Sequence, residues 1–178
     1  MIKKKICMLG SFGVGKTSLT AQFVARLFDD RYHTTVGVKV DKKLLQVDGV
    51  DLTLMVWDMA GEEDNLPIRL NYVNDAAGYI LVIDGTRAKT LDVALSIQER
   101  VQTHVGDLPF IAVINKADQR GNWEVQRSQI EDMASRGWTL LETSAKTGEH
   151  VEEMFVTLAR QILQAAVKDA DDGLPELV

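Results

Sequence analysis

The octapeptide GSFGVGKT at residues 10–17 constrains the fold of this chain more than any other feature of its sequence. It fits the pattern G-x-x-x-x-G-K-[ST] and stands between an apolar run and the start of a helical pattern. Glycines in such a loop let several backbone N–H groups converge on an anion, while Lys16 adds a point charge and the Thr17 hydroxyl can ligate Mg2+. The loop therefore predicts a strand–loop–helix unit that holds the phosphates of a nucleoside triphosphate.

Length and composition are those of one ordinary globular domain. The 178 residues suffice for a single buried core, and the net charge of -6 indicates neither nucleic-acid nor anionic-lipid binding. Cys7, the lone cysteine, lies in an apolar run, so we expect a buried thiol without a disulfide, as suits a reducing compartment. No apolar stretch approaches the ~20 residues of a membrane span, and we find no lipid-anchor motif. We therefore expect a cytoplasmic protein that reaches membranes only through a partner.

Apolar runs of strand length at residues 6–9, 77–83, 110–114 and 138–141 alternate with helical patterns. The clearest helical pattern begins near Glu149, a second follows Thr90 and a third lies between Asn122 and Gly137. The apolar spacing predicts that the first pattern faces inward through Val151, Met154, Phe155, Leu158, Ala159, Ile162, Leu163 and Ala166, and the second through Leu91, Ala94, Leu95, Val101 and Val105. This alternation predicts an α/β fold with a mostly parallel central sheet and helices on both faces. We expect the domain to span residues 1–167 and a short acidic tail at residues 168–178 to be disordered.

One section of the chain departs from the alternation of strands and helices. The strand-like runs at residues 38–47 and 51–57 are joined through Asp48 and Gly49, which is a hairpin signal. The two runs predict one antiparallel edge strand on the otherwise parallel sheet. The second run delivers Asp58 to the carboxyl end of the sheet, where open α/β folds bind their ligands.

Four further motifs follow the phosphate loop in order: YHTTVGV at residues 32–38, WDMAGE at 57–62, NKAD at 115–118 and TSAK at 143–146. Asp118 can accept two hydrogen bonds from guanine N1 and N2, whereas adenine leaves this carboxylate unpaired at a cost of ~1–3 kcal/mol. Together the five motifs resemble those of the Ras-like small GTPases, most of all the Rab branch, over roughly residues 5–165. The resemblance implies a P-loop NTPase fold of the Ras-like G-domain type that binds GTP or GDP with Mg2+ and hydrolyses GTP as a molecular switch.

The resemblance also implies a role for individual residues. The residues that it implies contact the nucleotide are Gly13, Val14, Gly15, Lys16, Thr17, Ser18, Phe28, Tyr32, Thr35, Gly61, Asn115, Lys116, Asp118, Ser144, Ala145 and Lys146. Metal ligation falls to Thr17, Thr35 and Asp58, the last through a bound water. Catalysis falls to Lys16, Thr35 and Glu62. Effectors, exchange factors and GTPase-activating proteins (GAPs) would contact residues 30–38 and 59–72 of a monomer.

Two residues depart from the family where hydrolysis is decided. Phe12 stands where a small residue is common, and a ring that excludes an incoming arginine finger forfeits ~10³ to 10⁵ in rate. A ring that points outward would leave the chemistry untouched. Glu62 stands where the family has glutamine, and as a carboxylate it cannot donate to the transition state, although a protonated side chain would recover the donor. Phosphate charge at ~5 Å and an effective dielectric of ~20 repels the carboxylate by ~3 kcal/mol per unit charge. The sequence therefore predicts slow intrinsic hydrolysis and a poor response to a conventional GAP.

Two alternatives remain open from the sequence. A non-hydrolysing GTP-binding scaffold would be held in one state by Phe12 and Glu62. A P-loop ATPase or nucleoside kinase would need an adenine-tolerant base site, against which the NKAD motif argues.

Overall fold

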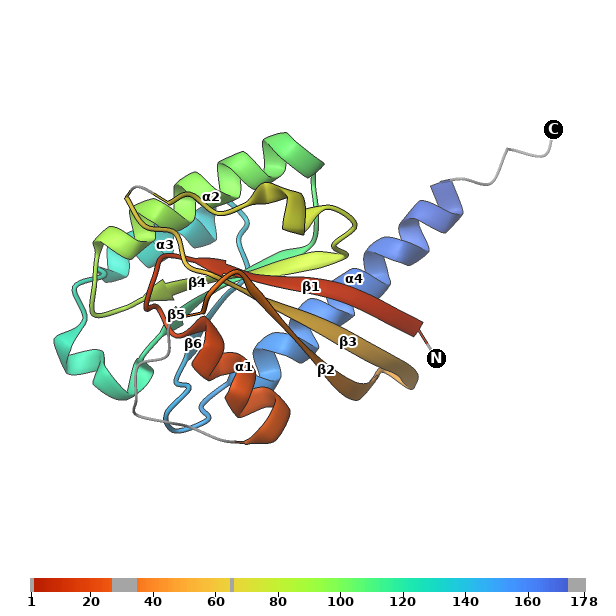
Figure 1. Cartoon of the computed structure of the whole chain (residues 1–178), viewed down its shortest axis with the longest axis horizontal. Helices are drawn as coiled ribbons and strands as arrows, with labels where there is room; N and C mark the ends of the chain where they lie inside the picture. The colour runs from red at the N-terminus through yellow and green to blue at the C-terminus, as the bar shows by residue number, and fades with distance from the viewer. Residues whose placement is uncertain (1, 27–34, 65, 173–178) are drawn as a thin grey trace.

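The computed structural model describes residues 2–26, 35–64 and 66–172, and these form one six-stranded sheet with helices on both faces (Figure 1). The strands are β1 (Ile2–Gly10), β2 (Val38–Val47), β3 (Val50–Met59), β4 (Gly78–Asp84), β5 (Phe110–Asn115) and β6 (Leu140–Thr143). Their order is β2-β3-β1-β4-β5-β6, and only β2 and β3 pair antiparallel. The predicted α/β fold with one antiparallel edge strand is confirmed.

The helices divide between the two faces of the sheet. They are α1 (Lys16–Ala25), α2 (Lys89–Val105), α3 (Arg127–Ser135) and α4 (Val151–Asp172), with 3-10 turns η1 (Leu70–Val73) and η2 (Ala117–Asn122). In Figure 1, α2 and α3 lie above the sheet and α1 lies below it, while α4 starts below the sheet and passes behind it. Helices α1 and α4 share one apolar cluster against the same face. None of the helices in the described ranges is long and apolar enough to cross a bilayer.

Two element boundaries differ from those that the sequence predicts. Strand β6 begins at Leu140 because Trp138 still belongs to the turn after α3, where its N–H donates to the carbonyl of Met133 at 3.3 Å. Helix α4 extends to Asp172, past the expected domain boundary at residue 167, because neither glycine nor proline interrupts it before Gly173. Residues 173–178, the rest of the expected tail, lie outside the described residues.

The β2–β3 hairpin turns through the two residues that the sequence singled out. Asp48 has φ of 51° and Gly49 has φ of 83°, the positive values that a two-residue hairpin turn requires. Val47 therefore pairs with Val50, and the register continues to Lys39 opposite Asp58. This register places Asp58, with its side chain fully buried, near the carboxyl end of β3.

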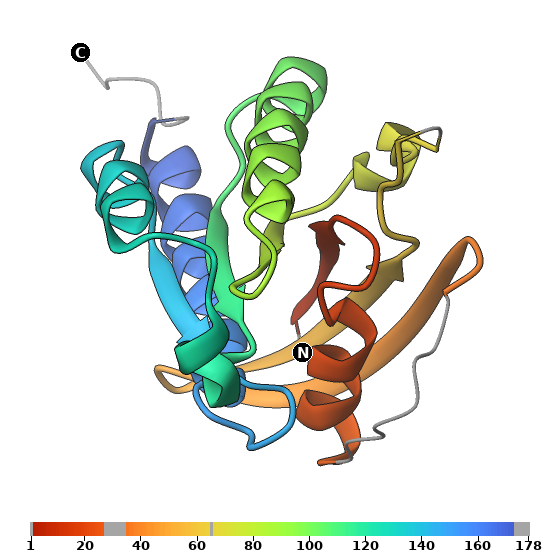
Figure 2. The ribbon, with the colours of Figure 1, turned by 90° about the vertical axis from the view of Figure 1, so that its left-hand side faces the viewer.

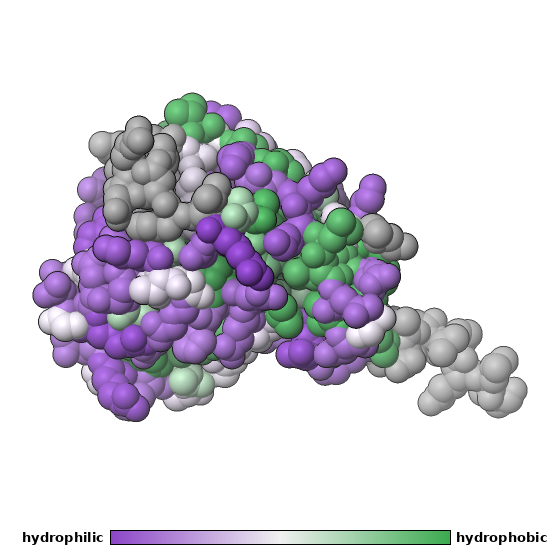
Figure 3. Space-filling model, turned by 90° about the horizontal axis from the view of Figure 1, so that it is seen from below, coloured by the Kyte–Doolittle hydropathy of each residue, from purple (hydrophilic) through white to green (hydrophobic). Residues whose placement is uncertain are grey.

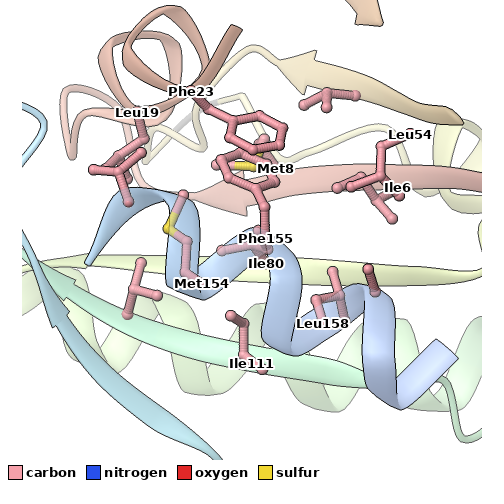
Figure 4. Packing of buried hydrophobic residues seen from close by; sticks show 14 of the residues in the cluster. Ile6, Met8, Leu19, Phe23, Leu54, Ile80, Ile111, Met154, Phe155 and Leu158 are labelled. Atoms are coloured by element: carbon pink, nitrogen blue, oxygen red, sulfur yellow. The ribbon is translucent and has the colours of Figure 1, made fainter. Parts of the chain in front are cut away.

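The sheet is held between two apolar clusters. Below it, the rings of Phe23 on α1 and Phe155 on α4 stack with centroids 3.8 Å apart, beside Met8 of β1 (Figure 4). Above it, α2 buries Ile97 and Val101 against the other face. The face predicted for α4 is buried from Val151 to Ile162, but Ala166 at its far end is exposed. In α2, Ile97 is buried although it was missing from the predicted face. Both clusters fix the sheet, so the loops at its carboxyl edge start from rigid strand ends.

The surface is largely polar in the view from below. Figure 3 shows mostly hydrophilic side chains there, with hydrophobic ones gathered toward the right-hand part of that face. Large hydrophobic side chains exposed among the described residues are Ile2, Val36, Val40, Leu44, Leu66 and Val167.

Candidate nucleotide-binding site

The chemistry-bearing loops meet at one edge of the sheet. Strands β1, β3, β4, β5 and β6 run parallel, so the segments that follow them emerge at the same edge, which faces the viewer in Figure 2. These segments begin at residues 11, 60, 85, 116 and 144. All of the predicted motifs except the first part of YHTTVGV therefore lie in described segments at this edge.

The phosphate loop leads directly from β1 into α1. Gly15, the N-cap of α1, has φ of 104°, and a Cβ there would lie 2.2 Å from Nδ2 of Asn115. Only glycine fits this position, because both the backbone conformation and the space exclude a side chain. The N–H groups of the first turn of α1 point into the loop, which is the anion-binding arrangement of a helix N-terminus.

Lys16 supplies a buried cation beneath the loop. The residue is 5% exposed, and its Nζ donates to the carbonyl oxygens of Ser11 at 2.9 Å and Gly10 at 3.3 Å. Burial lowers the pKa of Lys16 to about 8, with Asp58 opposing this shift and Arg87 adding to it. An anion beside Nζ would stabilise the charged ammonium that burial disfavours. The position thus favours a phosphate ligand.

The three predicted metal ligands converge. The Thr17 hydroxyl donates to Oδ2 of Asp58 at 2.6 Å and lies 2.7 Å from the Thr35 hydroxyl, which is itself 3.5 Å from Asp58 Oδ2. Burial raises the pKa of Asp58, against the Thr17 hydrogen bond and the charge of Lys16. Within the described residues, Oδ1 of Asp58 is buried without a hydrogen-bond partner. An all-oxygen set with one orphaned carboxylate oxygen fits Mg2+, which would supply positive charge to the phosphates.

The two base-reading motifs also meet. Asn115 donates from Nδ2 to the Val14 carbonyl at 2.9 Å, and its Oδ1 accepts from Thr143 Oγ1 and the Ala145 N–H, each at 3.3 Å. Ser144 donates to Oδ1 of Asp118 at 2.6 Å. The buried Asn115 therefore ties the NKAD and TSAK loops to the phosphate loop, and Ser144 orients the carboxylate expected to read guanine. Lys146 of the same loop is exposed.

Lys116 has a partner that the sequence did not predict. Its backbone is left-handed, with φ of 70°, and its carbonyl accepts from Trp123 Nε1 at 2.9 Å. Its Nζ lies 2.6 Å from Oδ2 of Asp84, a fully buried carboxylate at the end of β4. Burial alone would raise the pKa of Asp84, but hydrogen bonds from Lys116, Thr86 and Arg87 lower it below its usual value. The one sequence signal for this residue was an acidic side chain closing an apolar strand.

The segment after β3 packs against the phosphate loop through its backbone. Glu62 N–H donates to the Gly10 carbonyl at 3.1 Å, and Phe12 N–H donates to the Glu62 carbonyl at 2.9 Å. A Cβ on Gly61 would lie 2.4 Å from Cα of Phe12 and 2.8 Å from Nζ of Lys16. Gly61 is therefore required for this close approach, in keeping with its predicted place beside the phosphates.

The side chain of Glu62 turns to helix α2. Its carboxylate oxygens lie 2.5 and 2.7 Å from Nη2 of Arg100, and one of them accepts from the Ile68 N–H at 3.0 Å. The sequence did not predict this contact, because 38 residues separate the partners. Glu62 thus contributes its backbone to the phosphate loop and its carboxylate to an ion pair with α2.

All of the predicted nucleotide contacts remain predictions, and two of the residues fall outside the described ranges. Phe28 and Tyr32 lie outside the described residues. Gly13, Val14, Thr17 and Ser18 are described and belong to the phosphate loop and the first turn of α1.

The fold and this edge define a P-loop nucleoside-triphosphate-binding protein. A family model described as the Ras family matches residues 5–164, which is most of the chain, and the protein therefore belongs to the Ras family. It is a GTP-binding small GTPase of the switch type, a class that binds GTP and GDP with Mg2+ and engages regulators and effectors.

Proposed function

We propose that this small GTPase hydrolyses GTP slowly and signals through the ordering of residues 30–38 and 59–72. The observation that carries the slow rate is the tether of Glu62 to Arg100 and to the Ile68 N–H. A residue at this position that orients the attacking water must reach the transferred phosphoryl group. A carboxylate held by α2 is turned away from that task and has no proton to donate.

The two switch segments are linked in a way that supports their concerted ordering. The Ala60 N–H donates to the Gly37 carbonyl at 2.9 Å, so the segment after β3 is joined to the segment before β2. Thr35 reaches Thr17 and Asp58, while Gly61 reaches the backbone of Phe12. In the proposed switch, contacts at Thr35 and Gly61 order both segments together, and their loss releases both.

Lys16, Thr17 and Asp58 carry the nucleotide-binding part of the proposal. The buried Lys16 ammonium balances phosphate charge, and the Thr17 hydroxyl and the Asp58 carboxylate hold Mg2+ directly or through water. Asp118, oriented by Ser144, accepts hydrogen bonds from guanine. We further propose that the ring of Phe12, which stands where the family commonly has a small residue, obstructs an incoming arginine finger and so weakens the response to a conventional GAP.

Exposed apolar side chains support partner binding through the two segments. Val36 is 90% exposed and Leu66 is 58% exposed. Exposed apolar residues beside a nucleotide-controlled site are suited to effectors and exchange factors. The order and spacing of the five motifs support a place in the Rab branch. We further propose that the protein is a cytoplasmic monomer in which residues 1–167 form the G domain.

The test measures nucleotide state during turnover. Purified protein is loaded with GTP and Mg2+, and bound GTP and GDP are quantified by chromatography over hours, with excess ATP as competitor in a parallel sample. We expect bound GTP to be converted slowly to GDP, and we expect excess ATP not to displace the bound guanine nucleotide. GTP that stays bound without conversion would favour the non-hydrolysing scaffold, for which the Glu62–Arg100 tether is the supporting observation. Displacement by ATP would favour the ATPase or kinase alternative.

A further inference from the structure

Three residues from two segments surround the buried carboxylate of Asp84: Thr86 and Arg87 after β4, and Lys116 after β5. Its side chain is 0% exposed, and Oδ1 accepts from the Thr86 hydroxyl at 2.7 Å and the Thr86 N–H at 2.9 Å. Oδ2 lies 2.6 Å from Nζ of Lys116 and 2.9 Å from Nε of Arg87. A carboxylate with no access to water is stable only when such donors satisfy it. Asp84 therefore fixes the directions of the Lys116 and Arg87 side chains.

Arg87 extends this cluster to the phosphate loop. While its Nε bonds to Asp84, its Nη2 donates to the carbonyl oxygen of Phe12 at 2.8 Å, across 75 residues of sequence. The planar guanidinium holds both acceptors in one rigid fork. A chain of contacts thus runs from Lys116 in the NKAD motif through Asp84 and Arg87 to Phe12.

The Phe12 carbonyl has a counterpart two residues further along. Asn115 holds the carbonyl of Val14 through Nδ2 at 2.9 Å. A trans peptide places its N–H opposite its C=O, so holding these two carbonyls on the outer side of the loop turns the N–H groups of Gly13 and Gly15 the other way. Both glycines have positive φ, 71° and 104°, a conformation that leaves their amides free to face a bound anion.

We propose that Arg87 is a positioning residue for nucleotide binding: supported by Asp84, it fixes the Phe12–Gly13 peptide so that the Gly13 N–H donates to a phosphate of the bound nucleotide. Through Asp84 it also couples the phosphate loop to Lys116 in the base-reading loop. The proposal goes beyond the family assignment, because it assigns a function to two residues outside the five motifs, and it rests on the guanine nucleotide site described above.

The test compares Arg87→Gln with Arg160→Gln. Arg160 is a matched control because its side chain is 44% exposed, as is that of Arg87. Its guanidinium makes a bidentate ion pair with Asp48 in the β2–β3 hairpin, far from the site. The probe is N-methylanthraniloyl-GDP loaded with Mg2+, chased with unlabelled GDP, and the readout is its dissociation rate. We expect Arg87→Gln to speed release about tenfold, the size of one charge-assisted hydrogen bond, and Arg160→Gln to leave it unchanged.

Two further variants separate positioning from charge. Arg87→Lys keeps the charge but cannot fork, so we expect release nearly as fast as in Arg87→Gln. Asp84→Asn should also speed release, and adding Arg87→Gln to it should change the rate less than Arg87→Gln does alone, because both act through one contact chain. In 15N–1H spectra of the GDP complex, the Gly13 amide should shift in both Arg87 variants and stay in place in Arg160→Gln.

Release at the wild-type rate in Arg87→Gln would overturn the proposal, as would equal acceleration in Arg160→Gln or an unmoved Gly13 amide. Full rescue by Arg87→Lys would also overturn it, since charge alone would then suffice. A wild-type protein that fails to bind the labelled GDP would refute the guanine nucleotide site itself, a result distinct from any difference between variants.

Discussion

The Glu62→Gln substitution tests the proposed cause of slow hydrolysis. Glu62 is 16% exposed at its side chain, and its partner Arg100 is 33% exposed. Glutamine keeps an acceptor for the Ile68 N–H but loses the charge that binds Arg100. It also gains an amide that donates a hydrogen bond. The substitution therefore loosens the tether to α2 and adds the missing donor in one step.

The expected rate follows from two contributions. Arg100 is partly solvated, so weakening its ion pair costs about 1 kcal/mol, which raises the population of the released side chain about fivefold. The amide of the introduced glutamine can donate a hydrogen bond to the charge that develops in the transition state. Such a donor lowers the activation free energy by ~1–2 kcal/mol when it is not fully preorganised. A gain of 1–2 kcal/mol is about 5- to 30-fold in rate, so the two contributions together predict hydrolysis about 25- to 150-fold faster than in the wild type.

The assay is single-turnover hydrolysis of bound GTP with Mg2+ at 25 °C. Arg100→Gln is the companion variant, because it releases Glu62 without supplying a donor, and we expect its rate to stay within about threefold of the wild type. Each variant should lower Tm by about 2–4 °C for each kcal/mol of lost ion pairing. A Glu62→Gln rate within twofold of wild type would refute the reasoning, as would equal acceleration by Arg100→Gln.

Four other predictions follow from the same contacts. Gly61→Ala should force the segment after β3 away from Phe12 and speed hydrogen exchange of the Phe12 amide, and unchanged exchange would contradict the packing. Phe155→Ala should lower the free energy of unfolding by ~3–5 kcal/mol, measured in urea, and a loss under ~1 kcal/mol would contradict its place in the core. Burial raises the pKa of Cys7 to about 12, so a thiol reagent at pH 8 should label it only after unfolding, and rapid labelling of native protein would count against the buried site. The pKa of Asp84 is lowered from 3.8, so its ionised form stabilises the fold above that pH, and this contribution is lost as the pH falls through the lowered pKa. The difference in the free energy of unfolding between the wild type and Asp84→Asn should therefore become smaller in acid. A difference that does not change with pH would argue against the ion pairs.

Local patterns predicted much of the fold and part of the site. The spacing of apolar residues predicted the inward face of α4, and Asp48 with Gly49 predicted the hairpin, because both features depend on neighbours in sequence. The apolar pattern predicted for α2 did not include Ile97, which is buried. Trp138 was predicted to lie in a strand, but its N–H closes the turn after α3. Such errors arise where tertiary packing selects among locally similar conformations.

The sequence by itself determined the chemistry of this protein, since strand-end motifs on a parallel sheet must meet at one edge. It predicted which residues bind phosphate and metal, and the side chains of the three predicted metal ligands, Thr17, Thr35 and Asp58, do lie together. Only the tertiary structure decided where the carboxylate of Glu62 points and which side chain holds the Phe12 carbonyl. Arg100 of α2 lies 38 residues from Glu62 in the sequence, and Arg87 after β4 lies 75 residues from Phe12. Local sequence patterns cannot predict such contacts, because the partners meet only when the helices pack on the sheet.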